Sequence, residues 1–463
     1  EHQEVPGAQN HFNCPIVVSY PENIKNNVEA VTDGSVRYLH PFLAFTNEKV
    51  ASDRLVQFCK KVWNIPEKET RHAAHLAWEE QRRAKADVRA AGAKALADME
   101  KNGGSGIVLA GRPYHVDPEI NHGIPELIAA YGLTVLTEDC LPIDFVPKRP
   151  VRVNDQWVYH SRLYTAAEFV CGRDDLELIQ LNSFGCGLDA VTTDEVCELL
   201  EQGGKLYTCL KIDEVNNLGA VRIRIRSLLA AVAMRRERGI HSTAQVTPFE
   251  RVHYTKEMQR ERYTILAPQM SPIHFELLEP IFRHYGYNFE VLKNDDRNAI
   301  DVGLKYVNND ACFPSITAVG QLMEAVTSGR YDTDHLALIM SQTGGCCRAS
   351  NYIAFIRRAL KKAGLEHIPV ISLNANGMET NEGFRVSPAL LLTAARGIVL
   401  GDVLMRCLYR VRPYELTQGS ANALHRKWRD ICIDSLTSEH PKYRYAQLCR
   451  GIVEAFDTFP IDE

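Results

Sequence analysis

The chain lacks the short motifs that identify several common classes of protein. No two of its thirteen cysteines are three residues apart, which excludes zinc ribbons and the C-x-x-C runs of ferredoxins. No G-x-x-x-x-G-K-[ST] segment occurs, and no G-x-G-x-x-G turn opens a helix after a strand. The sequence therefore offers no nucleotide-binding loop of its own.

It also lacks charge of one sign and long apolar runs. Lys and Arg number 53 against 58 Asp and Glu, a formal net charge of −5 without any strongly one-signed block. The longest apolar runs, Ala389 to Ala395 and Ser227 to Met234, are far too short to span a bilayer. We therefore expect no nucleic-acid partner and no membrane, but a small-molecule or protein partner. The odd number of cysteines argues against a disulfide framework and favours a reducing cytoplasm.

What is present is the profile of an ordinary folded protein, with 45% hydrophobic and 24% charged residues. The 463 residues predict about three compact units, or two large ones. The sequence starts at Glu1 without a signal peptide and reaches the cysteine motif at Cys14 at once. We therefore expect further segments of a longer protein upstream.

The composition and pattern of the sequence change twice along the chain. Residues 1–50 are rich in turns and leave little room for long elements. Residues 51–101, rich in Ala, Lys, Arg and Glu, predict two helices broken near Pro66. From Gly106 onward, strands alternate with polar or glycine-rich loops and helices, which is typical of a parallel sheet with crossover helices.

This α/β pattern occurs twice. Leu176 to Cys186 and Leu336 to Cys346 align at an offset of 160 residues, each a strand that ends in a Gly-Cys turn. The step between successive strands is 28 residues in one copy (Ile107 to Val135) and 27 in the other (Thr264 to Val291). Two related α/β units follow, with a helical C-terminal segment from Pro388 to Asp457. The predicted domains are 1–103, a remnant of an upstream cluster domain followed by long helices; 104–245, the first α/β unit; and 246–463, the second α/β unit with C-terminal helices.

Five cysteines lie in turns. Three follow strands, where ligands of parallel sheets bind, and each of these Gly-flanked turns precedes a predicted helix whose free backbone N–H groups favour a thiolate or a sulfide-rich cluster. The other two lie in turns with proline close by, and one of them, Cys312, shortly precedes a predicted helix. Widely spaced single cysteines suit an iron–sulfur cluster held between domains. Burial as small apolar side chains stays open for them, as does a catalytic thiol, although no companion histidine beyond His115 or His122 is identifiable. The five are Cys14, Cys186, Cys312, Cys346 and Cys347.

The remaining cysteines are expected to pack in the core, since Cys59, Cys197, Cys432 and Cys449 lie within helical patterns and Cys209 within a strand. A separate signal is the loop Gly111 to His115, which follows the first strand. Its cation Arg112 and imidazole His115 predict an anion or substrate contact, with a purely structural turn as the alternative.

At these same positions the sequence resembles the large acyl-CoA dehydratase activase-related proteins over essentially its whole length. The resemblance implies that this chain corresponds to the C-terminal part of a longer protein, whose upstream segments resemble an ATPase activator of acetate-kinase/heat-shock-type fold. Its motifs are Gly106 to Leu127, Asn182 to Glu195, Leu210 to Asp213 with Gly219 to Arg226, Asn309 to Pro314 and Gln342 to Tyr352.

The region is also similar to the iron–sulfur subunits of 2-hydroxyacyl-CoA dehydratases and to double-cubane cluster proteins. That similarity implies a 4Fe–4S or double-cubane cluster held by Cys14, Cys186, Cys312 and one of Cys346 and Cys347. The internal repeat favours Cys346, whereas the family pattern Gly-Gly-Gly-Cys-Arg favours Cys347, which we prefer. A full double cubane needs more ligands, from upstream sequence or from Cys140 or Cys407.

The leading hypothesis is a cytoplasmic iron–sulfur module for ATP-dependent, low-potential electron transfer or reduction, associated with activation of a CoA-thioester dehydratase. One alternative is a docking scaffold without a cluster for a partner redox protein. Another is a 2-hydroxyacyl-CoA dehydratase-like enzyme acting at an open cluster iron, with Arg112 and His115 near the substrate. The expected partners are an ATPase activator domain, a CoA-thioester substrate or dehydratase, and a second copy in a homodimer.

Overall fold

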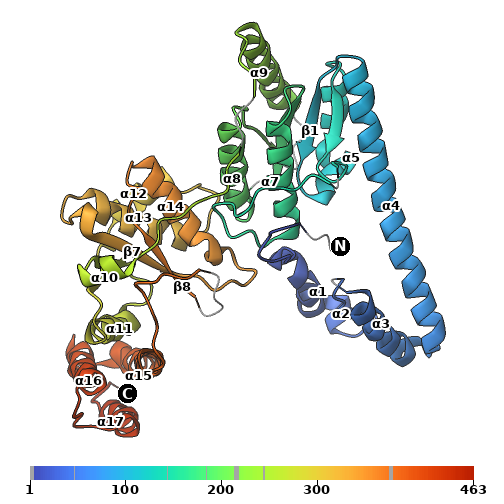
Figure 1. The fold of residues 1–463 in the computed structure, drawn as a ribbon. Coiled ribbons are helices and arrows are strands. Elements are labelled where there is room, and N and C mark those ends of the chain that lie inside the picture. Colours follow the sequence, from blue (N-terminus) through green and yellow to red (C-terminus); the bar gives the residue numbers. More distant parts are fainter. Residues whose placement is uncertain are drawn as a thin grey trace. The chain divides into compact units, whose positions relative to one another are not determined.

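The computed structural model describes residues 5–45, 47–142, 144–183, 185–212, 218–242, 246–374 and 379–462. The chain divides into two compact units (Figure 1). Unit 1 comprises residues 1–250 together with 345–348, and unit 2 comprises 251–344 and 349–463. Each holds a four-stranded parallel sheet with helices, so the predicted α/β fold of two related units is confirmed.

Unit 1 begins with helices. Pro66 separates α3 from α4, because proline lacks the N–H that a continuing helix needs, and α3 ends at Asn64 in the left-handed conformation. The expectation that residues 1–50 have no room for long elements is wrong. Pro15 occupies the first turn of α1, where a missing N–H costs nothing, and the helix continues past Pro21. The helices are α1 (Pro15–Asn27), α2 (Glu29–Thr32), α3 (Glu48–Trp63) and α4 (Glu67–Lys101).

The sheet of unit 1 has the strand order β2-β1-β3-β4. Strand β1 is buried along its whole length and β3 at all but its last residue, as expected for central strands covered on both faces. The strands are β1 (Gly106–Ala110), β2 (Thr134–Thr137), β3 (Leu176–Ser183) and β4 (Thr208–Ile212). The helices around them are η1 (Pro113–Val116), α5 (Pro118–Asn121), α6 (Ile124–Ala129), α7 (Val158–Cys171), α8 (Asp189–Gln202) and α9 (Leu218–Glu237).

The sheet of unit 2 repeats this topology, with the order β6-β5-β7-β8. The repeat is closest in β3 and β7, which begin at Leu176 and Leu336. The pairing registers differ: Ile107 lies beside Val135, 28 residues on, whereas Ile265 lies beside Phe289, 24 residues on. The strands are β5 (Thr264–Ala267), β6 (Phe289–Val291), β7 (Leu336–Ser341) and β8 (Val370–Leu373), and the helices are α10 (Lys256–Arg260), α11 (Pro272–His284), α12 (Arg297–Tyr306), α13 (Phe313–Thr327), η2 (Thr333–His335), η3 (Arg348–Asn351, which begins in the part assigned to unit 1) and α14 (Tyr352–Lys362).

The C-terminal segment of unit 2 is helical, as predicted, and packs against α11 around one apolar cluster (Figure 1). Gly397 and Gly401 let α11 approach closely. A Cβ atom at Gly397 would lie 2.8 Å from Cδ1 of Ile281, and one at Gly401 would lie 2.6 Å from Cδ2 of His274. The elements are α15 (Pro388–Val411), η4 (Arg412–Tyr414), α16 (Ser420–Thr437) and α17 (Tyr445–Asp457).

One helical stretch among the described residues, Pro388–Tyr414, is long and apolar enough to cross a membrane by length and composition alone. Its most apolar 18-residue window has a mean hydropathy of 1.6, and 28% of that window is buried. The apolar run counted in the sequence ends at Ala395, whereas the helix continues beyond it. Run length therefore understated the apolar surface of this segment.

The cysteines predicted to pack in the core do so only in part. Cys432 is fully buried and Cys449, partly buried, packs against the same apolar cluster, but Cys59, Cys197 and Cys209 are partly exposed. Helical periodicity gives a residue's face but not how completely that face is covered, which is why the prediction failed for them. Among the cysteines that the sequence left less certain, Cys140 and Cys171 are buried and Cys407 is partly exposed.

Candidate functional site

The candidate site lies at the carboxyl ends of β1 and β3 in unit 1 and centres on Arg112. This arginine follows β1, and its Nη2 atom donates to Sγ of Cys186 over 3.0 Å and to Oδ1 of Asp189. Nε2 of His160, on α7, lies 3.4 Å from the same nitrogen. Asp189 is the first residue of α8, so a strand end, a helix start and the neighbouring helix supply the cluster. A cation thus lies directly beside the sulfur of Cys186.

Charge pairing dominates the electrostatics of this cluster. Burial by itself would lower the pKa of Arg112, but the charges of Asp189 and Cys186 outweigh it and the pKa lies above its usual value. Burial would raise the pKa of Asp189, yet the hydrogen bond with His160 and the charge of Arg112 hold it below its usual value. Burial lowers the pKa of His160. The site therefore combines a fixed ion pair with a neutral imidazole.

His115 lies in the same loop as Arg112, and its imidazole is neutral. Its Nδ1 accepts the backbone N–H of Arg112 over 3.0 Å, so the neutral ring carries its proton on Nε2, which lies 3.0 Å from Oγ of Ser183. The Tyr114 hydroxyl also bonds Ser183 Oγ. Burial lowers the pKa of His115 to about 4, and protonation of Nδ1 would also set two N–H groups against each other. His115 is thus a positioning group for Ser183 at the end of β3.

A buried segment, Val151–Val158, brings other parts of unit 1 to this edge; we call it the Trp157 strap. Its side chains reach the Cys346–Cys347 segment: Trp157 Nε1 donates to the carbonyl of Cys346 over 3.0 Å, and Gln156 Nε2 to that of Cys347 over 3.1 Å. Its backbone pairs with the residues before Cys14, since Phe12 N donates to Gln156 O and Val158 N to Phe12 O. The ring of Trp157 lies beside that of His160, with centroids 5.3 Å apart.

Buried ion pairs fix the strap to the helices next to it. Arg149 Nε, just before the strap, donates to Asp155 over 2.8 Å, and Arg149 also pairs with Glu168 of α7. Arg152 pairs with Glu195 at 2.7 Å and with Glu198 at 2.8 Å, both on α8. Removing one partner of such a buried pair leaves an uncompensated charge and costs about 3–5 kcal/mol. The strap is therefore a rigid support rather than a free loop.

The predicted cysteines lie at helix starts, which the sequence predicted for Cys186, Cys312, Cys346 and Cys347 but not for Cys14. Cys14 caps α1, and Cys186 shortly precedes α8, its carbonyl accepting from Ala190 N over 3.2 Å. Cys346 and Cys347 precede η3, and a Cβ at Gly187 would collide with the guanidinium of Arg348 next to them. Unit 1 thus holds Cys14, Cys186, Cys346 and Cys347 on three segments that the strap and the Arg348 contact connect.

Cys312 belongs to unit 2. It caps α13, and its Sγ atom lies 2.8 Å from the hydroxyl of Tyr352, the first residue of α14. Its backbone carbonyl accepts from Ser315 N over 2.9 Å. The sulfur of Cys312 therefore lies beside a neutral hydroxyl, whereas the sulfur of Cys186 lies beside a guanidinium.

The donor set has the right chemistry for a cluster, but its geometry is not that of a closed metal site. In residues 5–462, leaving out the stretches without a described structure, no group of three His, Cys, Asp or Glu side chains is spaced to hold a metal ion. Arg112 Nε, His160 Nδ1 and Asp189 Oδ2 are buried beside Cys186 without a hydrogen-bond partner. Ordered water or a bound group would satisfy them. We derive no chemical step through a cluster from this arrangement.

Several residues of the site escaped the sequence analysis as individual contributors. Asp189 lay unremarked in the segment Asn182 to Glu195. The sequence analysis does not single out His160, Trp157 or Gln156. The run of polar residues between Val151 and Val158 is nevertheless a signal for a buried, hydrogen-bonded segment. Their role depends on contacts with residues far away in the chain.

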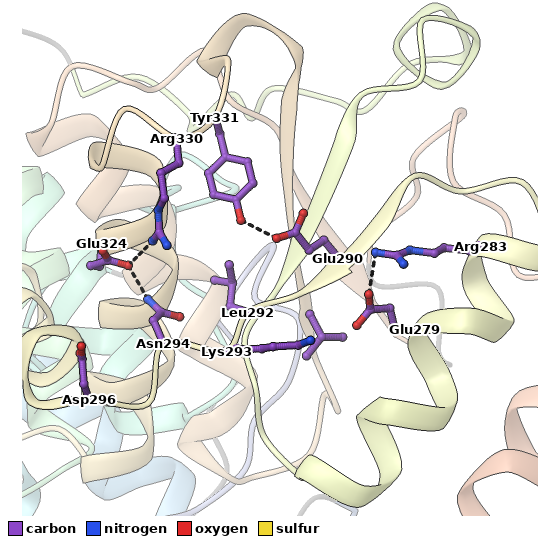
Figure 2. Close-up of a pocket in the computed structure, with 11 residues that line it drawn as sticks. Glu279, Arg283, Glu290, Leu292, Lys293, Asn294, Asp296, Glu324, Arg330 and Tyr331 are labelled. Carbon is purple, nitrogen blue, oxygen red and sulfur yellow. Dashed lines mark hydrogen bonds and ion pairs between the residues drawn. The ribbon is translucent and has the colours of Figure 1, made fainter. Parts of the chain in front are cut away.

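Unit 2 contains a separate cavity of about 610 Å³ beside the edge strand β6 (Figure 2). Its charged groups mostly pair with one another: Arg283 with Glu279 at 2.6 Å, Arg330 with Glu324 at 2.7 Å, and the Tyr331 hydroxyl with Glu290 at 2.5 Å (Figure 2). These pairings already satisfy the groups that would select a ligand. We therefore assign none to this cavity.

Comparison with known families gives one match. Residues 1–141 match the family model described as "CoA enzyme activase uncharacterised domain (DUF2229)". The matched region runs from the N-terminal helices through β1 and the Arg112 loop to the residues just after β2. No curated protein and no solved structure matches the chain. Over residues 1–141 the match supports the resemblance to acyl-CoA dehydratase activase-related proteins and an association with the activation of CoA-thioester dehydratases.

Proposed function

We propose that this chain is an iron–sulfur module that serves ATP-dependent, low-potential electron transfer in the activation of a CoA-thioester dehydratase. The observation that carries the proposal is the Cys186 sulfur beyond the carboxyl end of β3, which accepts a hydrogen bond from the guanidinium of Arg112, a side chain that is 11% exposed. A cation at this distance stabilises a thiolate or an anionic cluster and tunes its potential. The match of residues 1–141 to a CoA enzyme activase domain supports the biological setting.

The proposed ligands are Cys14, Cys186 and Cys347 of unit 1 and Cys312 of unit 2. Three of the four segments are connected in unit 1 through the Trp157 strap and Arg348, which supports a common role. A 4Fe–4S or double-cubane cluster, when bound, supplies electrons at low potential. We further propose that Arg112 orients and stabilises Cys186, since its guanidinium is turned toward sulfur and carboxylate inside the protein.

The proposed partners are an ATPase activator domain, in the same or a separate chain, and a dehydratase that receives the electrons. The proposed setting is the cytoplasm. Cys346, next to Cys347, is the alternative fourth ligand. Both carbonyls of this pair are held by the strap, so the backbone contacts do not select one sulfur over the other.

The test is anaerobic reconstitution of the full chain with iron and sulfide, followed by iron and sulfide analysis and electron paramagnetic resonance of the reduced protein. Cys186→Ser is expected to lower bound iron and to abolish or alter the reduced signal. Cys197→Ser is the matched control and is expected to keep both, because Cys197 lies within α8, where its Sγ donates to Glu201 over 3.3 Å. A folded protein that binds no iron, also in the presence of its activator, would favour a docking scaffold without a cluster.

A direct dehydratase activity is the second candidate, favoured by the placement of Arg112 and His115 on one loop at a strand end. It predicts turnover of a 2-hydroxyacyl-CoA that is lost in Arg112→Lys. The side chain of His115 is 1% exposed and bonded to Ser183, which favours a positioning role for it over direct substrate contact. Electron transfer to a separate dehydratase without any turnover by this chain alone would exclude this candidate.

A further inference from the structure

Helix α15 has apolar residues on two sides. Its inner side packs on α11 and includes Gly397, Leu400, Gly401 and Leu404, all buried. Its outer side carries large apolar residues that are about half exposed: Leu391 is 62% exposed, and Leu392, Ile398, Val399 and Tyr409 are also exposed, the last with the guanidinium of Arg412 over its ring. A helix that is apolar around most of its circumference is ordinarily covered on all those sides. The outer side of α15 therefore requires an occupant.

The outer residues follow the spacing of a helix–helix seam. Leu391, Ala395, Ile398, Asp402, Met405 and Tyr409 are separated by alternating steps of four and three residues, which is the repeat that a second helix packs against. We call these six residues the α15 seam. At 1.5 Å per residue the seam is about 27 Å long, enough for a continuous helical contact. The spacing therefore favours a helix as the occupant.

The charges on the seam indicate which helix. Asp402 interrupts the apolar positions near the middle of α15; its side chain is 62% exposed and pairs at 3.0 Å with Nε2 of His274 on α11. Arg406 follows one turn later on the same side. Two such helices that run antiparallel and meet at this level place Asp402 of each copy beside Arg406 of the other. A single polar position of this kind sets register and partner choice in helix pairs. The seam is thus complementary to itself in charge as well as in spacing.

We propose that the α15 seam is the interface between two copies of this chain, with the α15 helices antiparallel and Asp402 paired with Arg406 of the second copy. This proposal does not depend on the presence of a cluster. A lipid occupant is disfavoured because Asp402, Arg406 and Arg410 are exposed on or beside the seam, and such groups are expensive to bury in a bilayer. Between two copies the opposite charges meet.

The test is the mass of the full chain in solution, measured by light scattering and sedimentation equilibrium. The wild type is expected to form a dimer. Asp402→Arg and Arg406→Asp are each expected to weaken the dimer by at least about tenfold in Kd, since each sets like charges against each other. An equimolar mixture of the two variants is expected to recover the dimer, because the introduced arginine and the introduced aspartate then face each other across the interface. Circular dichroism checks that each variant is folded.

Leu304→Glu is the matched control, because Leu304 is an exposed apolar residue of α12 outside the seam, and its dimer is expected to persist. Ile398→Glu, on the seam, is expected to give a monomer. A wild-type monomer at micromolar concentration overturns the proposal, as does a mixture of the charge variants that stays monomeric. Flotation of the wild type with phosphatidylcholine–phosphatidylglycerol vesicles, lost in Ile398→Glu, would assign the seam to a lipid surface and overturn it as well.

Discussion

The two α/β units share one sheet topology but differ in the chemistry at the carboxyl ends of their strands. In unit 1 the position two residues after β1 is Arg112, and the helix start after Cys186 supplies Asp189. In unit 2 the corresponding positions are Gln269, two residues after β5, and Ala349, three residues after Cys346. A buried ion pair in one unit is thus absent from the equivalent place in the other.

In unit 2 the turn after β7 is satisfied by neutral groups. Gln342 Nε2 donates to Ser350 O over 3.1 Å, Ser372 Oγ donates to Gln342 Oε1 over 2.7 Å, and Gly344 N donates to Ser350 Oγ over 3.1 Å. A neutral network can stabilise a turn but does not stabilise an anionic sulfur in the way a guanidinium does. The comparison teaches that the fold supplies the position and the loop residues supply the chemistry.

Replacing Arg112 is expected to give the largest difference in stability between matched variants of the two units. Arg112→Met leaves Asp189 buried without its permanently charged partner and with only the neutral His160 beside it, so we expect a loss of about 3 kcal/mol in the free energy of unfolding. Gln269→Ala, the matched change in unit 2, is expected to cost less than about 1 kcal/mol. Urea denaturation at pH 7 measures both. Equal losses in the two variants would contradict the asymmetry between the units.

The buried histidine of unit 1 predicts a dependence of stability on pH. The pKa of His115 is about 4 in the folded protein against 6.5 for the free side chain, so the unfolded chain binds the extra proton first. Stability is therefore unaffected above pH 6.5 and falls as the pH drops toward 4, by up to about 3 kcal/mol from this group. His115→Gln is expected to flatten that part of the profile, whereas the exposed His335→Gln of unit 2 is expected to leave it unchanged. A slope that is the same in the wild type and His115→Gln would show that other groups cause it.

A smaller effect is expected from the Trp157 strap. Trp157→Phe keeps an aromatic ring but removes the donor to the carbonyl of Cys346, a loss of about 1 kcal/mol. Both sulfurs are already exposed, so cleavage of the backbone is the better measure of opening. We expect trypsin cleavage after Arg348 to become about fivefold faster, since 1 kcal/mol corresponds to that factor in the population of an open segment. Mass spectrometry identifies the cleaved bond, and Trp428→Phe in unit 2 serves as the control. An unchanged rate would mean that the strap does not hold this segment.

The smallest effect is expected at Cys312. Tyr352→Phe removes the hydroxyl 2.8 Å from its sulfur, and because thiols make weak hydrogen bonds the rate of alkylation by iodoacetamide should change by less than about threefold. The corresponding change at Cys186, made by Arg112→Met, is expected to be larger because a charged donor is lost. A larger change at Cys312 than at Cys186 would reverse the ranking of the two sulfur environments.

Much of the fold was predictable from local pattern. The helices on either side of Pro66, the strand from Leu176 and its repeat from Leu336 depend on turn residues and apolar runs, which act over a few residues. The predictions failed where contacts between distant parts of the chain decide the structure. Turn-forming residues did not prevent α1 from continuing past Pro21, and helical periodicity did not tell that Cys59 would be only partly covered.

The sequence by itself determined the α/β class, the internal repeat and the position of five cysteines beside turns and helix starts, because spacing and residue type are properties of short segments. Only the tertiary structure decided that Arg112 faces Cys186 and Asp189, and that Trp157 reaches the carbonyl of Cys346. These partners are separated by 74 to 189 residues along the chain, and no local rule couples positions so far apart. The same distinction applies to the α15 seam. The spacing of its residues is visible in the sequence, but their exposure depends on which side of α15 is covered by α11.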